Sequence, residues 1–377
     1  MPRVPVSVWL VVGSMAILWM VLGSRILPAA RSHDFLNLYT GASLALEGRF
    51  PDLHRVDVQL ARERRIFPQL ASLVPFVRPT FYALLLAPLA LLPYNAAFAA
   101  WIATQSLLLI ACFVWALKRF GPNALVFGAF YLPAPLGISA GQDCVEMLLI
   151  FILAYELLDR QKPFASGAAL AVMLIKFHLI LLWPLALLLQ RRWRMLAGFC
   201  GMAIVEVAVS LLLGGIQGAE SYVALLKNKS LDRLSPSPEM MISSQGFLSN
   251  LDIESGWAGY ALVLAVFVVF LWAIRKAPVW RMFALTALAS LFIVPHVYAY
   301  DGTLLLLPIW LLIFESVSPI TRIAATLFST PIPFGTALAG KPVAVISSAS
   351  LLTLTLIVAF ERSSHSKTKH LEVIRPD

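Results

Sequence analysis

Charged side chains inside long apolar runs are the residues of this sequence most able to do chemistry. Lys176 lies about midway through the apolar run 164–190, and Glu206 lies within the run 195–214. A charge at the centre of a membrane-spanning helix costs roughly 2.5 to 3.5 kcal/mol on insertion scales, so each of these residues needs a partner or a task. Two interpretations stay open for Lys176: a buried ion pair with Glu206 or Glu146 that holds helices together, or a contact to an anionic ligand.

Asp34 is the acidic residue best placed for proton transfer. It lies just beyond the first apolar run, within Arg31–Phe35, where a carboxylate at the membrane surface can meet both a lipid headgroup and water. A carboxylate in such a position can act as a general base. It can equally be the N-cap of the helix that we expect to begin next, because Asp is favoured at N-cap positions.

Motifs of soluble enzymes are nearly absent from the chain. There is no GxGxxG, GxxxxGK or HExxH motif and no Asp-x-Asp pair that would chelate a metal for a nucleotide sugar, so we predict neither a cofactor nor a metal site. One GxSxG occurs at 137–141. A nucleophile elbow needs a strand-to-helix turn, whereas this motif ends an apolar run, which favours a packing or turn role. The three cysteines lie in or beside apolar runs and give no disulfide or zinc spacing.

The composition indicates that these elements lie in a membrane. Of 377 residues, 60% are hydrophobic and 13% are charged, whereas soluble proteins carry about 25% charged residues. This excludes a soluble enzyme, and the low charge together with 23 Phe, 10 Trp and 9 Tyr excludes a disordered chain. The net charge is +9, but the positive residues form no block of five or more. The expected partner is therefore anionic membrane lipid and not nucleic acid.

We expect an all-α polytopic membrane protein, a single integral-membrane domain over residues 1–377 with about twelve transmembrane helices. A span needs about 20 apolar residues, and the apolar runs predict helices near 6–27, 79–93, 95–117, 122–139, 144–158, 164–190, 195–214, 257–274, 281–295, 302–317, 321–338 and 342–360. With both termini inside, most Lys and Arg residues of the short connections are cytoplasmic, as the positive-inside rule requires. The short outer connections then hold only Lys118, Arg119, Arg160, Lys162 and Lys341.

This topology leaves two large outer loops, 28–78 and 215–256, and a basic cytoplasmic tail, 361–377. The first loop is predicted to carry an amphipathic helix that lies on the membrane and ends at Gly48, since its apolar residues recur at helical spacing: Phe35, Leu38, Tyr39, Ala42 and Leu46. The second is predicted to be mobile at Ser235–Pro238 and to carry the apolar element 240–242. The arginines of the first loop argue against this orientation unless they serve something outside, and we prefer an anionic lipid ligand.

Several short stretches, in order and spacing over roughly residues 33–315, resemble the bacterial family 87 glycosyltransferases, which are integral-membrane enzymes of the GT-C fold. The opening run Asp34–Ser43, continued by Leu46–Asp52, is similar to the start of that family. The further similar stretches are Arg78–Phe81 leading to Ala87–Leu89, Gly141–Gln142 before a helix, Leu174–Lys176 running into Arg191–Trp193, and Pro295–His296 to Asp301. The chain departs from the family where a paired proline is common, at Arg78–Thr80, and after the glycine turn, at Phe50–His54.

The resemblance implies a GT-C glycosyltransferase of the cell (inner) membrane with an active site that faces the exterior. Such an enzyme transfers a hexose, most often mannose, from a polyprenyl-phosphate sugar donor to a lipid-linked or cell-envelope acceptor. Asp34 is then the general base of an inverting displacement. The remaining expected site residues are cationic groups at the donor phosphate, namely His296, Arg31, Arg49, Arg55, Arg78 and Lys176, and substrate-binding residues, namely Tyr300, Asp301 and Gln142.

Two other functions are compatible with intramembrane charges. A polytopic transporter or lipid flippase commonly has two repeated halves with corresponding broken helices, and the long loop after the first helix has no counterpart elsewhere in this chain. A non-catalytic scaffold subunit is the third hypothesis, and in such a protein Asp34 is only a cap.

Overall fold

The computed structural model describes residues 4–32, 34–228, 238–254 and 256–361, and throughout these ranges the regular elements are helices. An isolated antiparallel bridge joins Met241 and Tyr298. The all-α prediction is therefore confirmed for the described part of the chain.

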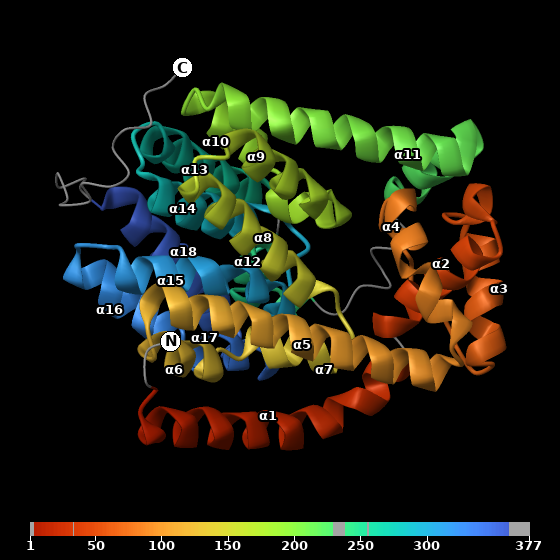
Figure 1. The fold of residues 1–377 in the computed structure, drawn as a ribbon, viewed down its shortest axis with the longest axis horizontal. Coiled ribbons are helices and arrows are strands. Elements are labelled where there is room, and N and C mark those ends of the chain that lie inside the picture. The colour runs from red at the N-terminus through yellow and green to blue at the C-terminus, as the bar shows by residue number, and fades with distance from the viewer. Residues whose placement is uncertain (1–3, 33, 229–237, 255, 362–377) are drawn as a thin grey trace.

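Five helical segments are long and apolar enough to cross a membrane. Three of them run along the long axis of the molecule in Figure 1: α1 (Val6–Ser32), α5 (Tyr94–Phe120) and α11 (Trp193–Leu226). The others are α13 (Trp257–Ile274) and the segment Pro163–Ile180, which combines α9 (Pro163–Val172) with the 3-10 helix η3 (Met173–Ile180). Helices satisfy their backbone groups internally and so tolerate lipid. The chain is a multi-pass membrane protein.

The shorter helices complete the bundle. Its centre is formed by α14 (Val279–Ile293) and α15 (Leu306–Phe314), which are buried on nearly every side, and a helix that is apolar all round is a core helix. Around them lie α6 (Asn123–Phe130), α7 (Pro133–Ser139), α8 (Cys144–Asp159), α10 (Trp183–Leu189), α16 (Pro319–Phe328), α17 (Ile332–Gly335) and α18 (Val345–Phe360).

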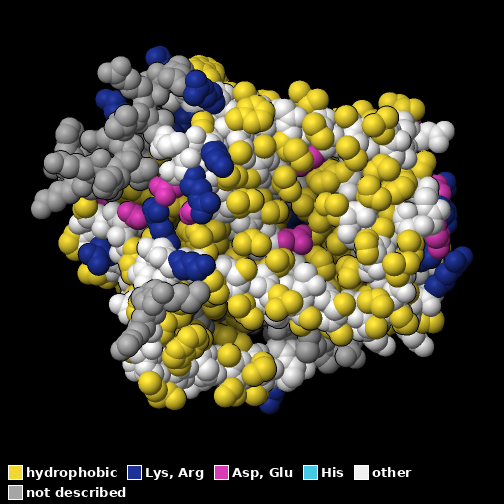
Figure 2. Space-filling view, viewed as in Figure 1, with side chains coloured by type: hydrophobic (Ala, Val, Ile, Leu, Met, Phe, Trp, Pro, Cys, Tyr) yellow, Lys and Arg dark blue, Asp and Glu magenta, His cyan; other side chains and the backbone are white. Residues whose placement is uncertain are grey.

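Three helices gather at one end of the molecule, at the right of Figure 1, which we call the α2–α4 end. They are α2 (Asp34–Leu46), α3 (Val56–Ile66) and α4 (Thr80–Leu86), the last continued by η2 (Ala87–Leu91). Helix α1 begins at the opposite end, where α18 finishes. Figure 2 shows Lys and Arg on the left part and at the right edge of this face, with a largely hydrophobic middle.

The segment predicted to span at 79–93 does not run from end to end. Tyr39 of α2 donates a hydrogen bond to the Leu92 carbonyl oxygen (2.9 Å), and its ring lies 5.1 Å from that of Tyr94. Both α4 and η2 pack against α2. The segment stays at the α2–α4 end, and α5 starts there and runs in the opposite sense to the prediction. A run of 12 helical residues, Thr80–Leu91, is short for a span.

The segment predicted to span at 164–190 is a helical hairpin. Phe164 packs against Gly198 near the start of α11, and Gln190, just before that same start, donates to the carbonyl oxygens of Ile274 and Ala277 (2.8 Å each). Lys176 at the tip has a non-helical backbone (φ −118°, ψ 64°). The two limbs, α9 and α10, therefore return to the same end.

These two corrections reverse the predicted side of several connections. Arg119 pairs with Asp159 (2.8 Å) and Glu315 (3.8 Å), so Lys118, Arg119, Arg160 and Lys162, predicted to be outer residues, lie at the end where α1 begins. Gly141 packs against Phe35 of α2, so the connection 140–143, predicted to be inner, lies at the α2–α4 end. The prediction of twelve spans fails at these two segments.

The first loop also differs from its prediction. Helix α2 has nine buried residues out of 13 and packs against α1, α3 and α4, so most of its side chains contact other helices. Its small polar residues are satisfied within the fold, as where Ser43 Oγ donates to the Thr40 carbonyl oxygen (2.9 Å). Thr40 and Ser43, two polar residues of the predicted amphipathic pattern, are therefore buried and not exposed.

The second loop is partly helical. Helix α11 continues to Leu226 across Gly215, whose backbone (φ 63°, ψ −172°) interrupts the helix. Met241 and Ile242 are buried, and α12 (Ser244–Asn250) follows them. Residues 229–237, which include most of the predicted mobile stretch Ser235–Pro238, and residues 362–377 of the predicted tail lie outside the described residues.

Candidate active site

A polar cavity of about 440 Å³ opens at the α2–α4 end, and we call it the polar cavity. Its walls come from the start of α2, the segment before α4, the turn before α8, the hairpin tip η3, the end of α11 and the stretch before η6 (Ala299–Leu305). Segments from residue 34 to residue 301 thus meet in one place.

Seven of the ten predicted site residues line this cavity: Asp34, Arg78, Gln142, Lys176, His296, Tyr300 and Asp301. Arg49 and Arg55 do not line it. Both pair with Asp52, at 2.8 and 3.3 Å, and Arg55 also pairs with Asp57 at 2.8 Å. The backbone of Arg31 belongs to the end of α1, and its side chain lies outside the described part.

Asp143 does not line the cavity, but it is the centre of the ion pairs of Arg78 and Lys176 on its wall, and the sequence did not predict it as a site residue. Its fully buried carboxylate accepts two hydrogen bonds from Arg78, from Nε at 2.7 Å and Nη2 at 3.0 Å, and lies 2.8 Å from Lys176 Nζ. A bidentate arginine–carboxylate pair fixes both orientation and distance. Asp143 therefore joins the segment before α4 to the tip of the helical hairpin.

Lys176 has three oxygen neighbours, as many as an ammonium group has N–H donors. They are Asp143 Oδ1 (2.8 Å), Asp301 Oδ1 (2.9 Å) and Gln142 Oε1 (3.4 Å). The predicted partners Glu206 and Glu146 were wrong. The sequence showed that the charge needed compensation, but Asp143, one of the two compensating carboxylates, lies on a connection whose side had been misjudged.

Other residues hold this arrangement in place. Gly141 has φ +71°, a conformation that costs other residues free energy, and this turn brings Gln142 and Asp143 to the start of α8. His54 is buried, and its Nε2 lies 2.8 Å from the Arg78 carbonyl oxygen. Burial lowers the pKa of His54 to about 4, so at neutral pH the ring is uncharged and Nε2–H can donate to that oxygen.

Side chains of α3 in the first loop also hydrogen-bond to the segment before α4. Glu63 of α3 is buried and accepts a hydrogen bond from the Val74 backbone N–H (3.0 Å). Burial raises the pKa of Glu63 to about 8, and the hydrogen bond from Val74 offsets only part of this rise. Gln59 also donates to and accepts from the backbone of Phe76 (3.4 and 2.8 Å).

Asp34 is the first residue of α2 and is half-buried. A carboxylate in the first turn of a helix is stabilised by the helix dipole. The Asn37 side chain donates to the Asp34 carbonyl oxygen (2.8 Å), and the charge of Asp34 acts on Tyr300, which lines the same cavity. Asp34 therefore faces the same space as residues more than 260 positions later.

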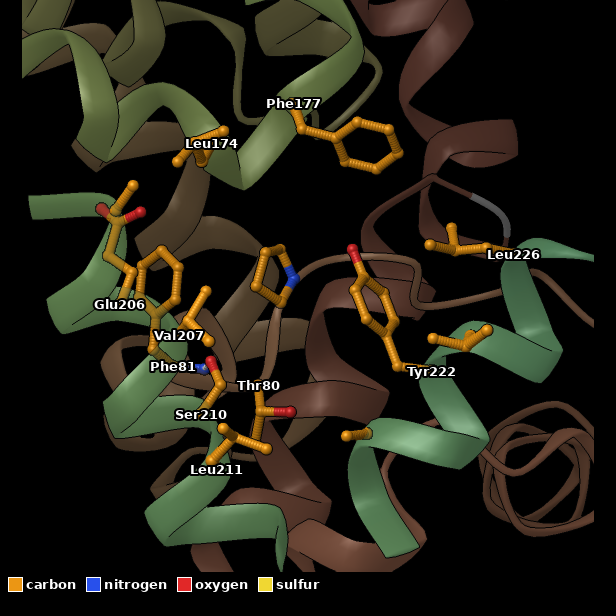
Figure 3. A pocket seen from close by; sticks show the side chains of 14 residues that line it. Thr80, Phe81, Leu174, Phe177, Glu206, Val207, Ser210, Leu211, Tyr222 and Leu226 are labelled. Carbon is orange, nitrogen blue, oxygen red and sulfur yellow. Dashed lines mark hydrogen bonds between the residues drawn. The ribbon is translucent and has the colours of Figure 1, made fainter. Parts of the chain in front are cut away.

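A second cavity of about 380 Å³ is predominantly apolar, and we call it the apolar pocket. It shares Phe177 and Leu226 with the polar cavity. Figure 3 shows Glu206 on one wall and Tyr222 on the opposite wall. Both walls belong to α11, because the interruption at Gly215 separates the two limbs of that helix. The two cavities thus adjoin, one polar and one apolar.

The cavity also holds polar residues that the sequence analysis did not choose, including His178, Asn37, Asn228 and Tyr298. His178 follows Lys176 by two positions, so the charge of Lys176 within an apolar run was the sequence signal that could have pointed to it. Within the described residues, no group of three or more His, Cys, Asp and Glu side chains could hold a metal ion.

Comparison with known proteins identifies the family. No curated protein and no solved structure matches the chain. The sequence pattern of glycosyltransferase family 87 matches residues 76–308, which carry Arg78, Lys176 and His296 but not Asp34. Since the matched range covers more than half of the 377 residues, the chain belongs to glycosyltransferase family 87 and is a membrane glycosyltransferase.

Proposed function

We propose that the protein transfers a hexose, and that this hexose is mannose, from a polyprenyl-phosphate sugar to a hydroxyl group of a lipid-linked or cell-envelope acceptor. The observation that carries this proposal is the pair of adjoining cavities. A polar cavity with charged groups suits a sugar phosphate, and the adjoining apolar pocket suits a long hydrocarbon chain. A nucleotide sugar has no such chain.

Asp34 is the general base in this proposal. The acceptor hydroxyl oxygen forms a bond to the anomeric carbon, its proton passes to the Asp34 carboxylate, and the bond between the anomeric carbon and the phosphate oxygen breaks. The electron pair of that bond leaves with the lipid phosphate. Direct displacement inverts the anomeric carbon. A base must lie within hydrogen-bond reach of the hydroxyl, which the location of Asp34 on the cavity wall supports.

Arg78 and His296 stabilise the leaving phosphate. The guanidinium of Arg78 uses Nε and Nη2 for Asp143 and makes no further hydrogen bond to the described residues, so Nη1 remains available. Lys176 is engaged by three protein oxygens and acts as a positioning residue. Tyr300, Asp301 and Gln142 complete the sugar side of the cavity. Cations that meet developing charge lower the barrier most when they are held in place beforehand.

The polar cavity faces the exterior of the inner membrane in this proposal. The connections at the end opposite α2–α4 carry Lys118, Arg119, Arg160, Lys162, Arg191, Arg192, Arg275 and Lys276. Positive residues in short connections favour the cytoplasmic side. The arginines of the first loop argue only weakly against this orientation, because three of them are paired with carboxylates. The pairs are Arg49 with Asp52, Arg55 with Asp57 and Arg62 with Glu47.

A choice of donors tests the proposal. Purified protein in detergent, given an envelope lipid extract as acceptor, should transfer radiolabelled mannose from polyprenyl-phosphate mannose and none from GDP-mannose. Transfer should persist in EDTA, because the proposed leaving-group contacts are side chains. Transfer from GDP-mannose alone, or loss on chelation that a divalent ion restores, would overturn the proposed donor or the leaving-group mechanism.

A further inference from the structure

We propose that His178, which neither the sequence pattern nor the family match assigns, binds the phosphate of the lipid donor. This inference rests on the proposed function, because it names a further contact within the same site. It makes His178 a second imidazole beside His296 on the wall of the polar cavity.

The location of His178 supports this role. It lies on η3, two residues after the interruption at Lys176, and it lines the polar cavity. Its ring packs edge-on against Phe177 (5.8 Å between centroids), and it makes no hydrogen bond to a residue of the described part of the chain. Its electrostatic neighbours are Asp301, Lys176, Arg78 and Asp143. Within the described residues, the ring nitrogens of His178 therefore have no hydrogen-bond partner, and the residue lines a cavity.

The junction of the two cavities indicates where the phosphate of an amphiphile lies. A polyprenyl phosphate changes from polar to apolar at the bond between its phosphate and its chain. The polar cavity and the apolar pocket meet at Phe177 and Leu226, which line both. The phosphate is therefore expected beside Phe177, whose two chain neighbours, Lys176 and His178, also line the polar cavity. Lys176 is engaged by three protein oxygens, which leaves His178 for the phosphate.

The charge balance of the cavity explains why an imidazole donor suits the phosphate. The cations of Arg78 and Lys176 are balanced by Asp143 and Asp301, and Asp34 adds one more negative charge. An anionic phosphate therefore finds no excess positive charge among these five side chains. In either protonation state an imidazole offers an N–H donor, so His178 can bind a phosphate oxygen without an ion pair being broken.

Binding of two matched probes tests the inference. Farnesyl phosphate and farnesol share one chain and differ by the phosphate, and their affinities for the purified full-length protein can be compared. The wild type should prefer farnesyl phosphate. His178→Phe keeps an aromatic ring and removes the donor, and should weaken farnesyl phosphate about tenfold, as expected for a hydrogen bond to a charged group, while farnesol is unchanged. His178→Gln, which restores an N–H donor, should recover part of the preference.

The outcomes separate this inference from the proposed function. Equal affinity of the wild type for both probes would refute a lipid-phosphate site altogether. A wild-type preference that His178→Phe retains in full would refute the role of His178 alone. Arg160→Gln, at an exposed pair with Glu156 far from the cavity, serves as the matched control and should not change either affinity.

If His178→Phe does not fold, the wild-type protein still decides the question. Diethyl pyrocarbonate modifies accessible imidazoles, and peptide mass spectrometry locates the modified residue. Farnesyl phosphate should protect His178 from modification and farnesol should not. Equal protection by the two probes, or none by either, would overturn the role of His178.

Discussion

Asp143 is the residue on which the geometry of the cavity depends most. It is fully buried and compensates two cations that come from different parts of the chain, Arg78 and Lys176. Breaking a buried ion pair by removing one partner leaves an uncompensated charge, which costs much more than the net contribution of the intact pair. The conformations of the hairpin tip and of the segment before α4 are therefore linked through one carboxylate.

Replacement of Asp143 should be strongly destabilising. Asp143→Ala leaves Arg78 without its carboxylate and leaves Asp301 as the remaining carboxylate at Lys176. The variant should lower the free energy of unfolding by about 3 to 5 kcal/mol, read as a drop in the unfolding temperature in detergent. Asp57→Ala removes a carboxylate from the exposed pair with Arg55 and is the matched control, with little change expected. Comparable stability of the two variants would show that the fold does not depend on the ion pairs of Asp143.

Gly141 is the residue that aligns α2 with the turn before α8. Its φ is +71°, and a Cβ there would lie 2.8 Å from Cβ of Phe35, the neighbour of Asp34. Gly141→Ala should therefore displace the start of α2 and lower transfer activity at least tenfold. The left-handed backbone should also lower the free energy of unfolding by about 1 to 2 kcal/mol. Gly48→Ala, also at positive φ but with open space around the Cβ, should carry only the backbone cost. Equal activity of the two variants would contradict this account.

At the scale of elements, the apolar runs predicted where helices lie but not whether each crosses the molecule. The helices begin and end close to the predicted bounds even at 79–93 and 164–190. The sequence could not reveal that the first stays at one end, because its path depends on contacts such as that of Tyr39 with Leu92. In the second, Lys176 and Pro184 were the available signals of an interruption, yet a single long span accounted for the same apolar pattern.

The same limit explains which site residues could be predicted. Asp34, Arg78 and His296 lie in the short stretches on which the sequence resemblance rested, and the cavity brings them together. Arg49 and Arg55 were chosen only for their charge in an outer loop, and their carboxylate partners Asp52 and Asp57 occupy them. Asp143 was placed on the wrong side by the error at 79–93, so its pairing with Arg78 could not be foreseen.

Helix α3 gives the stability of the first loop a characteristic pH dependence. The pKa of Glu63 is raised from 4.5 to about 8 by burial, so between these values the folded protein holds a proton that the unfolded chain has lost. Its contribution to stability is complete below about pH 4.5 and is lost as the pH rises through 8. Glu63→Gln, which keeps the acceptor for Val74 N–H, should flatten the fall in unfolding temperature between pH 5.5 and 8.5.

The control for this prediction is a carboxylate of the same loop with the opposite shift. Glu47 is exposed, and its hydrogen bond to Arg62 lowers its pKa below the ordinary value, so Glu47→Gln should leave the slope above pH 5.5 unchanged. Identical slopes for wild type and Glu63→Gln would mean that Glu63 is ionised in the folded protein.

At the scale of the whole molecule, the corrected path of the chain strengthens the charge asymmetry between its ends. The twelve-span scheme left Lys118, Arg119, Arg160 and Lys162 on the outer side, against the positive-inside rule. The structure moves these residues to the end that already carries Arg191 and Arg275. Lys341, the fifth residue first assigned to a short outer connection, pairs with Asp252 (2.8 Å).

Site-directed labelling distinguishes the two topologies. In a background with the exposed Cys200 replaced by Ser, we expect Asp57→Cys to react with a membrane-impermeant maleimide on intact cells and Lys162→Cys to react only after the membrane is opened. The twelve-span scheme predicts that both react on intact cells. Reaction of Lys162→Cys alone would reverse the orientation and turn the polar cavity to the cytoplasm.

Asp34→Asn tests the central claim most directly. Asn keeps the size, polarity and helix-start preference of Asp, but its amide cannot accept the proton of the acceptor hydroxyl. A general base contributes about 10² to 10⁴ in rate, so the variant should fold and bind farnesyl phosphate normally and lose at least about a hundredfold in mannose transfer from polyprenyl-phosphate mannose. Asp57→Asn, in the same loop and outside the cavity, should transfer at the wild-type rate. Normal accumulation of Asp34→Asn with near wild-type transfer would contradict the assignment of Asp34 as the base.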